Sequence, residues 1–114
     1  MKKSELYDIV YIDHVLDYIV IVEKILLCGN RDFITELAIV RAMEVIGEAA
    51  NNVSKELKIR HSDVPWRQIV DMRNMLIHGY FEVDMKEVWS ACEKDIPLLK
   101  EQIIKIKEEL KDAN

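Results

Sequence analysis

Hydrophobic residues recur every three or four positions along most of this chain, and glycine and proline are scarce, with 3 and 2 copies. Both features are typical of long helices with few turns. The first such stretch, from about Ser4 to Cys28, is apolar on one stripe and carries further valines beside it. Ser4 is expected to cap the start of this helix, and Gly29-Asn30 to end it. A helix this apolar must be covered on more than one side.

The second helix is predicted from roughly Phe33 to Leu57, where apolar residues keep the same spacing. Its opposite side carries a polar row formed by Arg41, Glu44, Glu48 and Asn51. Such a row is either an ordinary solvated face or, if the domain dimerises, the lining of a shared cleft.

The segment "KIRHSDVPWRQ" is predicted to be a loop that ends one helix and starts the next. Pro65 suits the first turn of a helix, and Ser62 and Asp63 are available to cap it. The third helix is therefore expected from about Pro65 to His78, with Gly79 as a left-handed glycine at its end.

The fourth helix is expected to begin after Asp84, because "DMKE" is an acidic form of the capping box with Glu87 three residues on. Pro97 should kink this helix near Glu93. Four helices with short connections predict an all-α fold, an antiparallel four-helix bundle with a kinked C-terminal helix. We see no internal repeat, so residues 1–114 are expected to form a single domain.

Composition limits the functions that such a bundle can have. The net charge of −5 argues against a protein that coats nucleic acid nonspecifically, because phosphate contacts need a basic surface. From Lys55 to Arg73, however, there are five Lys and Arg against three acids, a local charge of +2 that leaves −7 for the rest. This local excess is either ordinary surface variation or a small basic footprint. A short chain with surplus apolar helix surface is also expected to self-associate.

Cysteine usage and the N-terminus bear on the compartment. Cys28 and Cys92 are far apart and in no CxxC pair, so both are expected to be small core residues in a reducing environment. The first residues soon reach Glu5 and Asp8, which does not fit a signal peptide, and "IVIVEKILLC" is too short to span a bilayer. We therefore expect a cytoplasmic protein without a membrane segment.

Most familiar catalytic and metal-binding patterns are absent from the sequence. It has no glycine-rich phosphate loop, HExxH motif, CxxC pair or serine in a nucleophile elbow. His14 and His61 have no second ligand at metal spacing, so surface or boundary roles are expected for both. No metal and no cofactor are expected.

The remaining candidates lie together in "RNMLIHGY", which runs from Arg73 to Tyr80. Arg73 offers a planar cation that suits a phosphate, and Asn74 can orient a neighbouring group. His78 lies in the last turn of its helix, where the helix dipole favours the imidazolium and a nearby guanidinium opposes it, a balance that suits acid–base work.

The spacing of Arg73 and His78 raises a difficulty. Five residues turn a helix by roughly 500°, so the two side chains point about 140° apart. They can converge only through the long arginine side chain and an unwound helix end, or across a dimer. Without such convergence, the segment is a core helix that ends in a surface histidine and a packed tyrosine.

Arg73, His78 and Tyr80 match the R-x4-H-x-Y signature of HEPN-domain proteins, and the chain resembles specifically their HepT (DUF86) branch. The resemblance extends from about Arg41 onward, through "AMEVIGEAANNVSKEL", "DVPWRQIVDMRNMLIHGYFEVDMKEVW" and "EKDIPLLKEQI". R-x4-H alone is a weak pattern, but together with the tyrosine, the "IGEAA" block and the "PWR" start it is strong. Asn74 matches the polar residue that usually follows the arginine.

The resemblance implies a HEPN-like helical bundle that forms a homodimer and brings two R-x4-H motifs into one cleft. The family is similar to metal-independent endoribonucleases that act as toxins of type II toxin–antitoxin systems. Its antitoxin is a minimal nucleotidyltransferase (MntA-like) that transfers AMP to the motif tyrosine. On this chain the resemblance implies that Arg73 and His78 are catalytic, Asn74 is supporting, and Tyr80 is the AMP acceptor, with tRNA or mRNA as substrate.

Three functions stay open at this point. The first is a toxin-type ribonuclease, which the intact motif favours. The second is a non-catalytic partner subunit that binds a nucleotidyltransferase and its nucleotide or substrate, which the negative net charge mildly favours. The third is a plain helical dimerisation module, in which Arg73 and His78 are replaceable without loss of any activity.

Overall fold

The computed structural model describes residues 3–79 and 82–112. Within these residues the chain forms six helices, which are α1 (Lys3–Cys28), α2 (Phe33–Asn52), α3 (Lys55–Arg60), α4 (Trp66–His78), α5 (Met85–Lys94) and α6 (Ile96–Asp112).

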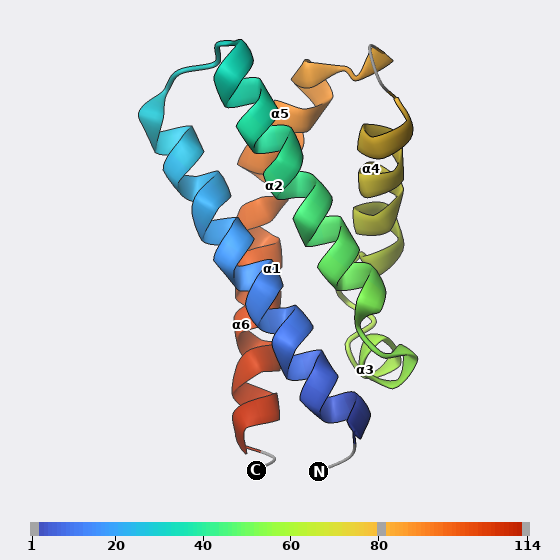
Figure 1. Ribbon diagram of the computed structural model, residues 1–114. Helices are drawn as coiled ribbons and strands as arrows, with labels where there is room; N and C mark the ends of the chain where they lie inside the picture. Colours follow the sequence, from blue (N-terminus) through green and yellow to red (C-terminus); the bar gives the residue numbers. More distant parts are fainter. Residues whose placement is uncertain (1–2, 80–81, 113–114) are drawn as a thin grey trace.

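Successive long helices run in opposite directions (Figure 1). α2 returns beside α1, α4 runs back along α2, and α5 and α6 together form the last leg, so that the start of α1 and the end of α6 lie at the same end of the molecule. α1 packs against α2 and α6, while α2 also packs against α4. The predicted all-α antiparallel bundle is confirmed, with two of its four expected helices each divided into two. Among the described residues, no helix is both long enough and apolar enough to cross a membrane.

The core lies between α1, α2, α5 and α6, where the apolar stripes meet. Its fully buried side chains include Ile12 and Ile19 of α1, Ile39 and Ile46 of α2, and Ile103 and Ile106 of α6. Cys92 is buried among them as expected, and this burial raises the pKa of its thiol to about 12. Cys28 is exposed, against expectation, because it is the last residue of α1 and lies beyond the packed length of the bundle.

The first helix ends as predicted, but its start differs. Gly29 has a φ of +69° and its amide donates to Leu26 O at 3.2 Å, the left-handed turn that glycine permits after a helix. Ser4 is not the cap, because α1 already includes Lys3 and Ser4 lies within its first turn. α2 and α6 cover two sides of this helix, and a third side, with Val10 47% exposed, stays open within the chain.

The predicted second helix is wrong at its C-terminal end, because it divides at Ser54. The hydroxyl of Ser54 caps α3 by accepting from the Leu57 amide at 3.2 Å. Asp8 of α1, only 3% exposed, accepts from the Ser54 amide at 2.7 Å and from its hydroxyl at 2.6 Å. A buried carboxylate needs such donors, and it finds them where the α2 ladder is interrupted. The apolar spacing continues across the break, so the sequence pattern alone did not reveal it.

The predicted cap of α4 is also wrong. α4 begins at Trp66, and the residue before it, Pro65, makes no side-chain capping bond, so neither Ser62 nor Asp63 caps this helix. The entry is held instead by the Trp66 indole, whose Nε1 donates to His61 O at 3.0 Å. A bond from the tryptophan back to the preceding loop therefore takes the place of a side-chain cap.

The glycine after α4 has a different role from the one expected. Gly79 is right-handed, with φ −76° and ψ −23°, and its amide still donates to Met75 O at 2.7 Å. A Cβ at this position would lie 2.5 Å from Met75 O and 3.0 Å from Val83 Cγ2. Glycine is needed here for space and not for a positive φ.

The last leg of the bundle breaks close to the expected position. Asp84 caps α5 by accepting from the Lys86 amide at 3.0 Å, which confirms the predicted start. α5 ends at Lys94 and α6 starts at Ile96, with Pro97 in its first turn. Because proline cannot donate into the preceding turn, the kink predicted near Glu93 occurs at Asp95.

Candidate active site

α4 presents Arg73 toward α2 because the two helices approach unusually closely. Gly47 of α2 lies directly opposite, and a Cβ built on it would be 2.2 Å from Arg73 Cβ and 3.2 Å from Ile69 O. No side chain larger than hydrogen fits between the two backbones. The glycine of the "IGEAA" block therefore sets the depth at which the arginine side chain leaves α4.

The guanidinium of Arg73 is held on two sides. Its Nη2 lies 2.6 Å from Glu48 Oε2, and its Nη1 donates to Asn74 Oδ1 at 2.8 Å. Its Nε is buried and has no hydrogen-bond partner among the described residues. The Arg73 side chain is 26% exposed, so one cationic edge is fixed by neighbours while the group still borders solvent.

Arg73 lines a shallow hollow of about 300 Å³ on the face formed by α1, α2 and α4. We call it the motif hollow, and its lining comprises Tyr11, His14, Arg41, Glu44, Val45, Glu48, Ala49, Asn52, Arg73 and Ile77. Three members of the polar row on α2 take part, whereas the fourth, Asn51, does not. The row therefore surrounds Arg73 on a hollowed surface.

Sequence analysis did not foresee that α1 contributes to this hollow. Tyr11 and His14 are one helical turn apart, with ring centroids separated by 6.4 Å at an edge-on angle of 80°. His14 was expected to have a surface or boundary role without function. It is exposed, but it lines the same hollow as Arg73. The only indication in the sequence was two polar aromatic residues at i and i+3, a spacing too common to single out.

His78 lies elsewhere on α4. It is the last residue of the helix, it is exposed, and it does not line the motif hollow. Because α4 is regular up to Gly79, the unwound helix end that could have let Arg73 and His78 converge within one chain is not present. Asn74 is also exposed, and its Oδ1 accepts a hydrogen bond from Arg73. Tyr80 lies outside the described residues.

The third histidine, His61, contacts a carboxylate near the opposite end of α4. His61 Nε2 lies 2.7 Å from Glu109 Oε2 of α6, beside an Arg60–Glu109 pair at 3.3 Å. Over residues 3–79 and 82–112, no three His, Cys, Asp or Glu side chains are grouped as a metal site. Arg73, Asn74 and His78 therefore remain the candidates for chemistry among the described residues.

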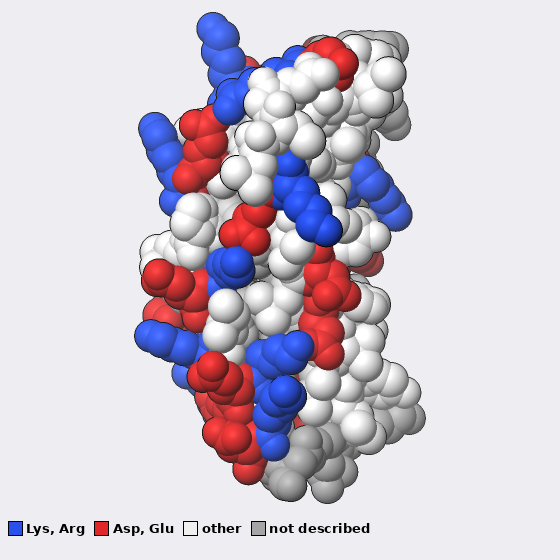
Figure 2. Space-filling model, turned by 90° about the vertical axis from the view of Figure 1, so that its left-hand side faces the viewer, with Lys and Arg blue, Asp and Glu red and all other residues white. Residues whose placement is uncertain are grey.

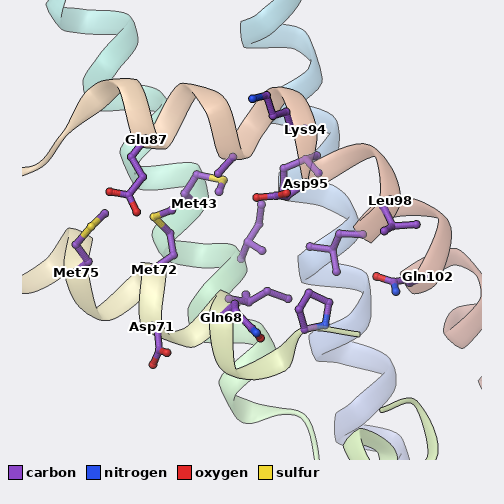
Figure 3. A pocket seen from close by; sticks show the side chains of 16 residues that line it. Met43, Gln68, Asp71, Met72, Met75, Glu87, Lys94, Asp95, Leu98 and Gln102 are labelled. Carbon is purple, nitrogen blue, oxygen red and sulfur yellow. The ribbon is translucent and has the colours of Figure 1, made fainter. Parts of the chain in front are cut away.

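A separate groove of about 520 Å³ lies on the other side of α4, between this helix and α5–α6 (Figure 3). Met72 and Met75 of α4 and Met43 of α2 line it, with Glu87 and Gln102 among its polar groups. None of Arg73, Asn74 and His78 belongs to its lining. This groove and the motif are thus on different faces of α4.

An all-α antiparallel bundle with an R-x4-H motif on its third long helix defines the class of protein, a HEPN-like domain. The family model "Ribonuclease HepT-like" matches residues 15–106. The chain belongs to the ribonuclease HepT-like family.

Named relatives agree with this assignment. The chain is similar to the probable ribonuclease HepT of Thermococcus cleftensis, with 41% identity over 71% of each chain. It is similar to "Putative RNase TTE0752" of Caldanaerobacter subterraneus subsp. tengcongensis, with 38% identity over 84% of this chain and 90% of that one. It is also 39% identical to "Gamma-glutamylcyclotransferase and putative RNase MJ0434" of Methanocaldococcus jannaschii, over 89% of this chain but about half (48%) of that protein. No solved structure matches the chain significantly.

Proposed function

We propose that this protein is a metal-independent endoribonuclease, the toxin of a type II toxin–antitoxin system, whose active site forms between two copies of the chain. One observation carries the proposal. Arg73 leaves α4 toward the motif hollow, whereas His78 leaves the intact end of the same helix on another side. One phosphate can meet both groups when the arginine and the histidine come from different chains.

The surface around the motif supports a homodimer. Val10 of α1 is 47% exposed and Ile77 of α4 is 36% exposed, so apolar side chains lie at or near the motif hollow. A two-fold dimer uses the same patch on both copies, and pairing this face would place two motif hollows against each other. It would also cover part of the third, open side of α1.

The proposed chemistry is a transesterification. The RNA 2′-oxygen attacks the adjacent phosphorus, the bond to the 5′-oxygen breaks, and a cyclic phosphate and a 5′-hydroxyl result. His78 moves a proton, from the attacking hydroxyl or to the leaving oxygen. Arg73 stabilises the charge that develops on the phosphorane, with Asn74 fixing its orientation.

Control by a minimal nucleotidyltransferase antitoxin belongs to the same proposal. AMP attached to Tyr80, two residues after His78, adds a bulky anion next to the scissile phosphate. It would exclude RNA by size and by like-charge repulsion. We propose tRNA or mRNA as substrate and the cytoplasm as the site of action.

A second function has one observation in its favour. Glu48 Oε2 lies 2.6 Å from Arg73 Nη2, so it neutralises part of the positive charge that would bind a phosphate. The chain as a whole has a net charge of −5. A non-catalytic subunit that only docks a nucleotidyltransferase does not require a free arginine. This candidate predicts that purified dimers leave RNA intact.

Mixing two inactive variants tests the proposal and its geometry together. Arg73→Ala and His78→Ala are purified separately, then unfolded, mixed in equal amounts and refolded. A site shared between chains restores cleavage up to about a quarter of the wild-type rate, since half of the dimers are mixed and each of these has one intact site. Sites contained within single chains give no recovery. Wild-type dimers that leave both tRNA and mRNA intact would contradict the proposed function itself.

A further inference from the structure

The local positive charge of the sequence gathers at one place in the fold. Lys55 and Lys58 of α3 and Arg67 of α4 line a shallow depression of about 570 Å³, together with Trp66. We call these four residues the basic shelf. In Figure 1, α3 lies beside the start of α4, at the end of that helix opposite His78. Only one acid, Asp63, shares the lining.

The cations of the shelf differ from others on this protein. On the α1–α6 side, Lys100 lies 3.0 Å from Glu23 and Lys107 lies 2.8 Å from Asp13, so positive and negative groups alternate on that face (Figure 2). Lys55 and Arg67 are exposed, and neither forms an ion pair within the described part of the chain. The shelf is therefore a surface of uncompensated charge.

Lys58 and Asp63 are both held by residues of other helices. Lys58 Nζ donates to Asn51 O at 3.1 Å, and burial lowers the pKa of its ammonium while the charge of Asp8 opposes that effect. Asp63 is held toward α6, where Gln102 Nε2 donates to its backbone oxygen at 3.0 Å and reaches its carboxylate at 3.5 Å. The acid is thereby turned to a neighbour on another helix.

Trp66 adds an aromatic surface. Its Nε1 donates to His61 O at 3.0 Å, which fixes the ring, and the residue is only partly buried. A fixed, partly exposed indole beside cations is the combination with which proteins bind unpaired bases and their phosphates. Duplex recognition needs no such ring, so the shelf favours a single strand.

The position of the shelf connects it to the motif. Asn74 and His78 follow Arg67 by 7 and 11 residues, which places each of them within about 20° of Arg67 around α4, and all three are exposed. The rise from Arg67 to His78 is about 16 Å. One face of α4 thus leads from the shelf to the histidine.

We propose that the basic shelf binds the phosphate backbone and one base of a single-stranded RNA whose scissile phosphate lies at His78. This inference rests on the proposed function and adds to it the part of the substrate that is held away from the bond that breaks. The shelf raises affinity for long RNA and plays no part in the chemical step. It also accounts for how a chain of net charge −5 holds a polyanion.

Binding is tested in the His78→Ala background, so that no RNA is cleaved. The shelf variant is Lys55→Gln with Arg67→Gln, which leaves Lys58 and its contact to Asn51 intact. The matched control is Lys105→Gln with Lys111→Gln, two exposed lysines of α6, which changes the net charge equally. Fluorescence anisotropy measures the affinity for a single strand of about 16 nucleotides at several salt concentrations.

Losing two phosphate contacts should lower the slope of log affinity against log salt by about 1.4. Between 50 and 200 mM salt, the parent and the control should therefore lose about sevenfold more affinity than the shelf variant. Equal slopes for all three proteins, or no RNA binding by the parent, would overturn the inference. In that event an acidic protein, and not RNA, becomes the candidate ligand of the shelf.

Cleavage separates this inference from the proposed function. With His78 present, the shelf variant should cleave long RNA more slowly at subsaturating concentration and a dinucleotide at the wild-type rate. If wild type cleaves RNA and the shelf variant matches it on both substrates, only the shelf inference fails. If nothing is cleaved but the shelf variant still binds RNA with the lower slope, only the ribonuclease proposal fails.

Discussion

The two sides of α4 are packed in opposite ways. Toward α2, Gly47 lets the helices approach until an added Cβ would touch Arg73 Cβ at 2.2 Å. Toward α5 and α6, the same helix faces a groove of about 520 Å³ lined by three methionines (Figure 3). A close backbone contact has little freedom to move, whereas methionines adapt to what lies beside them. The motif arginine is on the rigid side, where its direction is set before any substrate arrives.

The largest expected effect concerns the histidine at the end of α4. His78→Ala should lower RNA cleavage by about 10² to 10⁴-fold, because it removes the proposed proton-transfer group. His61→Ala is the control, since His61 lies at the other end of α4 beside Glu109. Single-turnover cleavage measures the rate. Equal rates for wild type and His78→Ala would mean that the motif does not carry the chemistry.

The rigid side of α4 should not tolerate one added methyl group. Helix propensity alone predicts that Gly47→Ala stabilises α2, but the contact with Arg73 should reverse the sign and cost about 3 kcal/mol of unfolding free energy. Urea denaturation measures this cost. Ala38→Gly on the exposed side of α2 is the control for propensity and should cost about 1 kcal/mol. A more stable Gly47→Ala protein would show that the two helices separate easily.

The groove side should accept changes of shape. Met72→Leu and Met75→Leu keep the volume and apolar character of two partly buried side chains, so each should cost less than about 1.5 kcal/mol of unfolding free energy. The same denaturation experiment measures it. Losses as large as that of Gly47→Ala would mean that the two sides of α4 are equally rigid, and the comparison would be wrong.

The smallest effect should come from the ion pair on the rigid side. Glu48→Gln keeps a hydrogen-bond acceptor for Arg73 and removes the opposing charge, at a pair whose members are 26% and 52% exposed. At such exposure we expect RNA to bind about two- to fivefold more tightly in the His78→Ala background. Arg41, whose side chain is 72% exposed, gives the comparison for a neighbouring charge through Arg41→Gln. Weaker binding by Glu48→Gln would mean that Glu48 is needed to position Arg73.

The candidate site could be predicted from the sequence only in part. Arg73, Asn74 and His78 were found as a motif, and α4 carries all three as expected. Their surroundings were found only in part, because the polar row of α2 was noted as a possible cleft lining but its place beside Arg73 was not. The contributions of Tyr11, His14 and Glu48 depend on how α1 and α2 lie against α4, and helical spacing within one segment says nothing of neighbouring helices. The local excess of positive charge was recognised along the chain. That Lys55, Lys58 and Arg67 lie together on α3 and α4 was not predicted.

By itself the sequence determined the helices, their order and the motif, because helical periodicity, glycine stops and proline kinks act over a few residues. Gly29 and Asp84 behaved as local chemistry predicts. Only the tertiary structure decided where α2 breaks, since the donors at Ser54 satisfy a carboxylate from α1 that lies 46 positions earlier. It also decided what Gly47 is for, because a Cβ there would lie 2.2 Å from Arg73 Cβ on another helix. Such contacts join residues distant in the chain, and no local pattern encodes them.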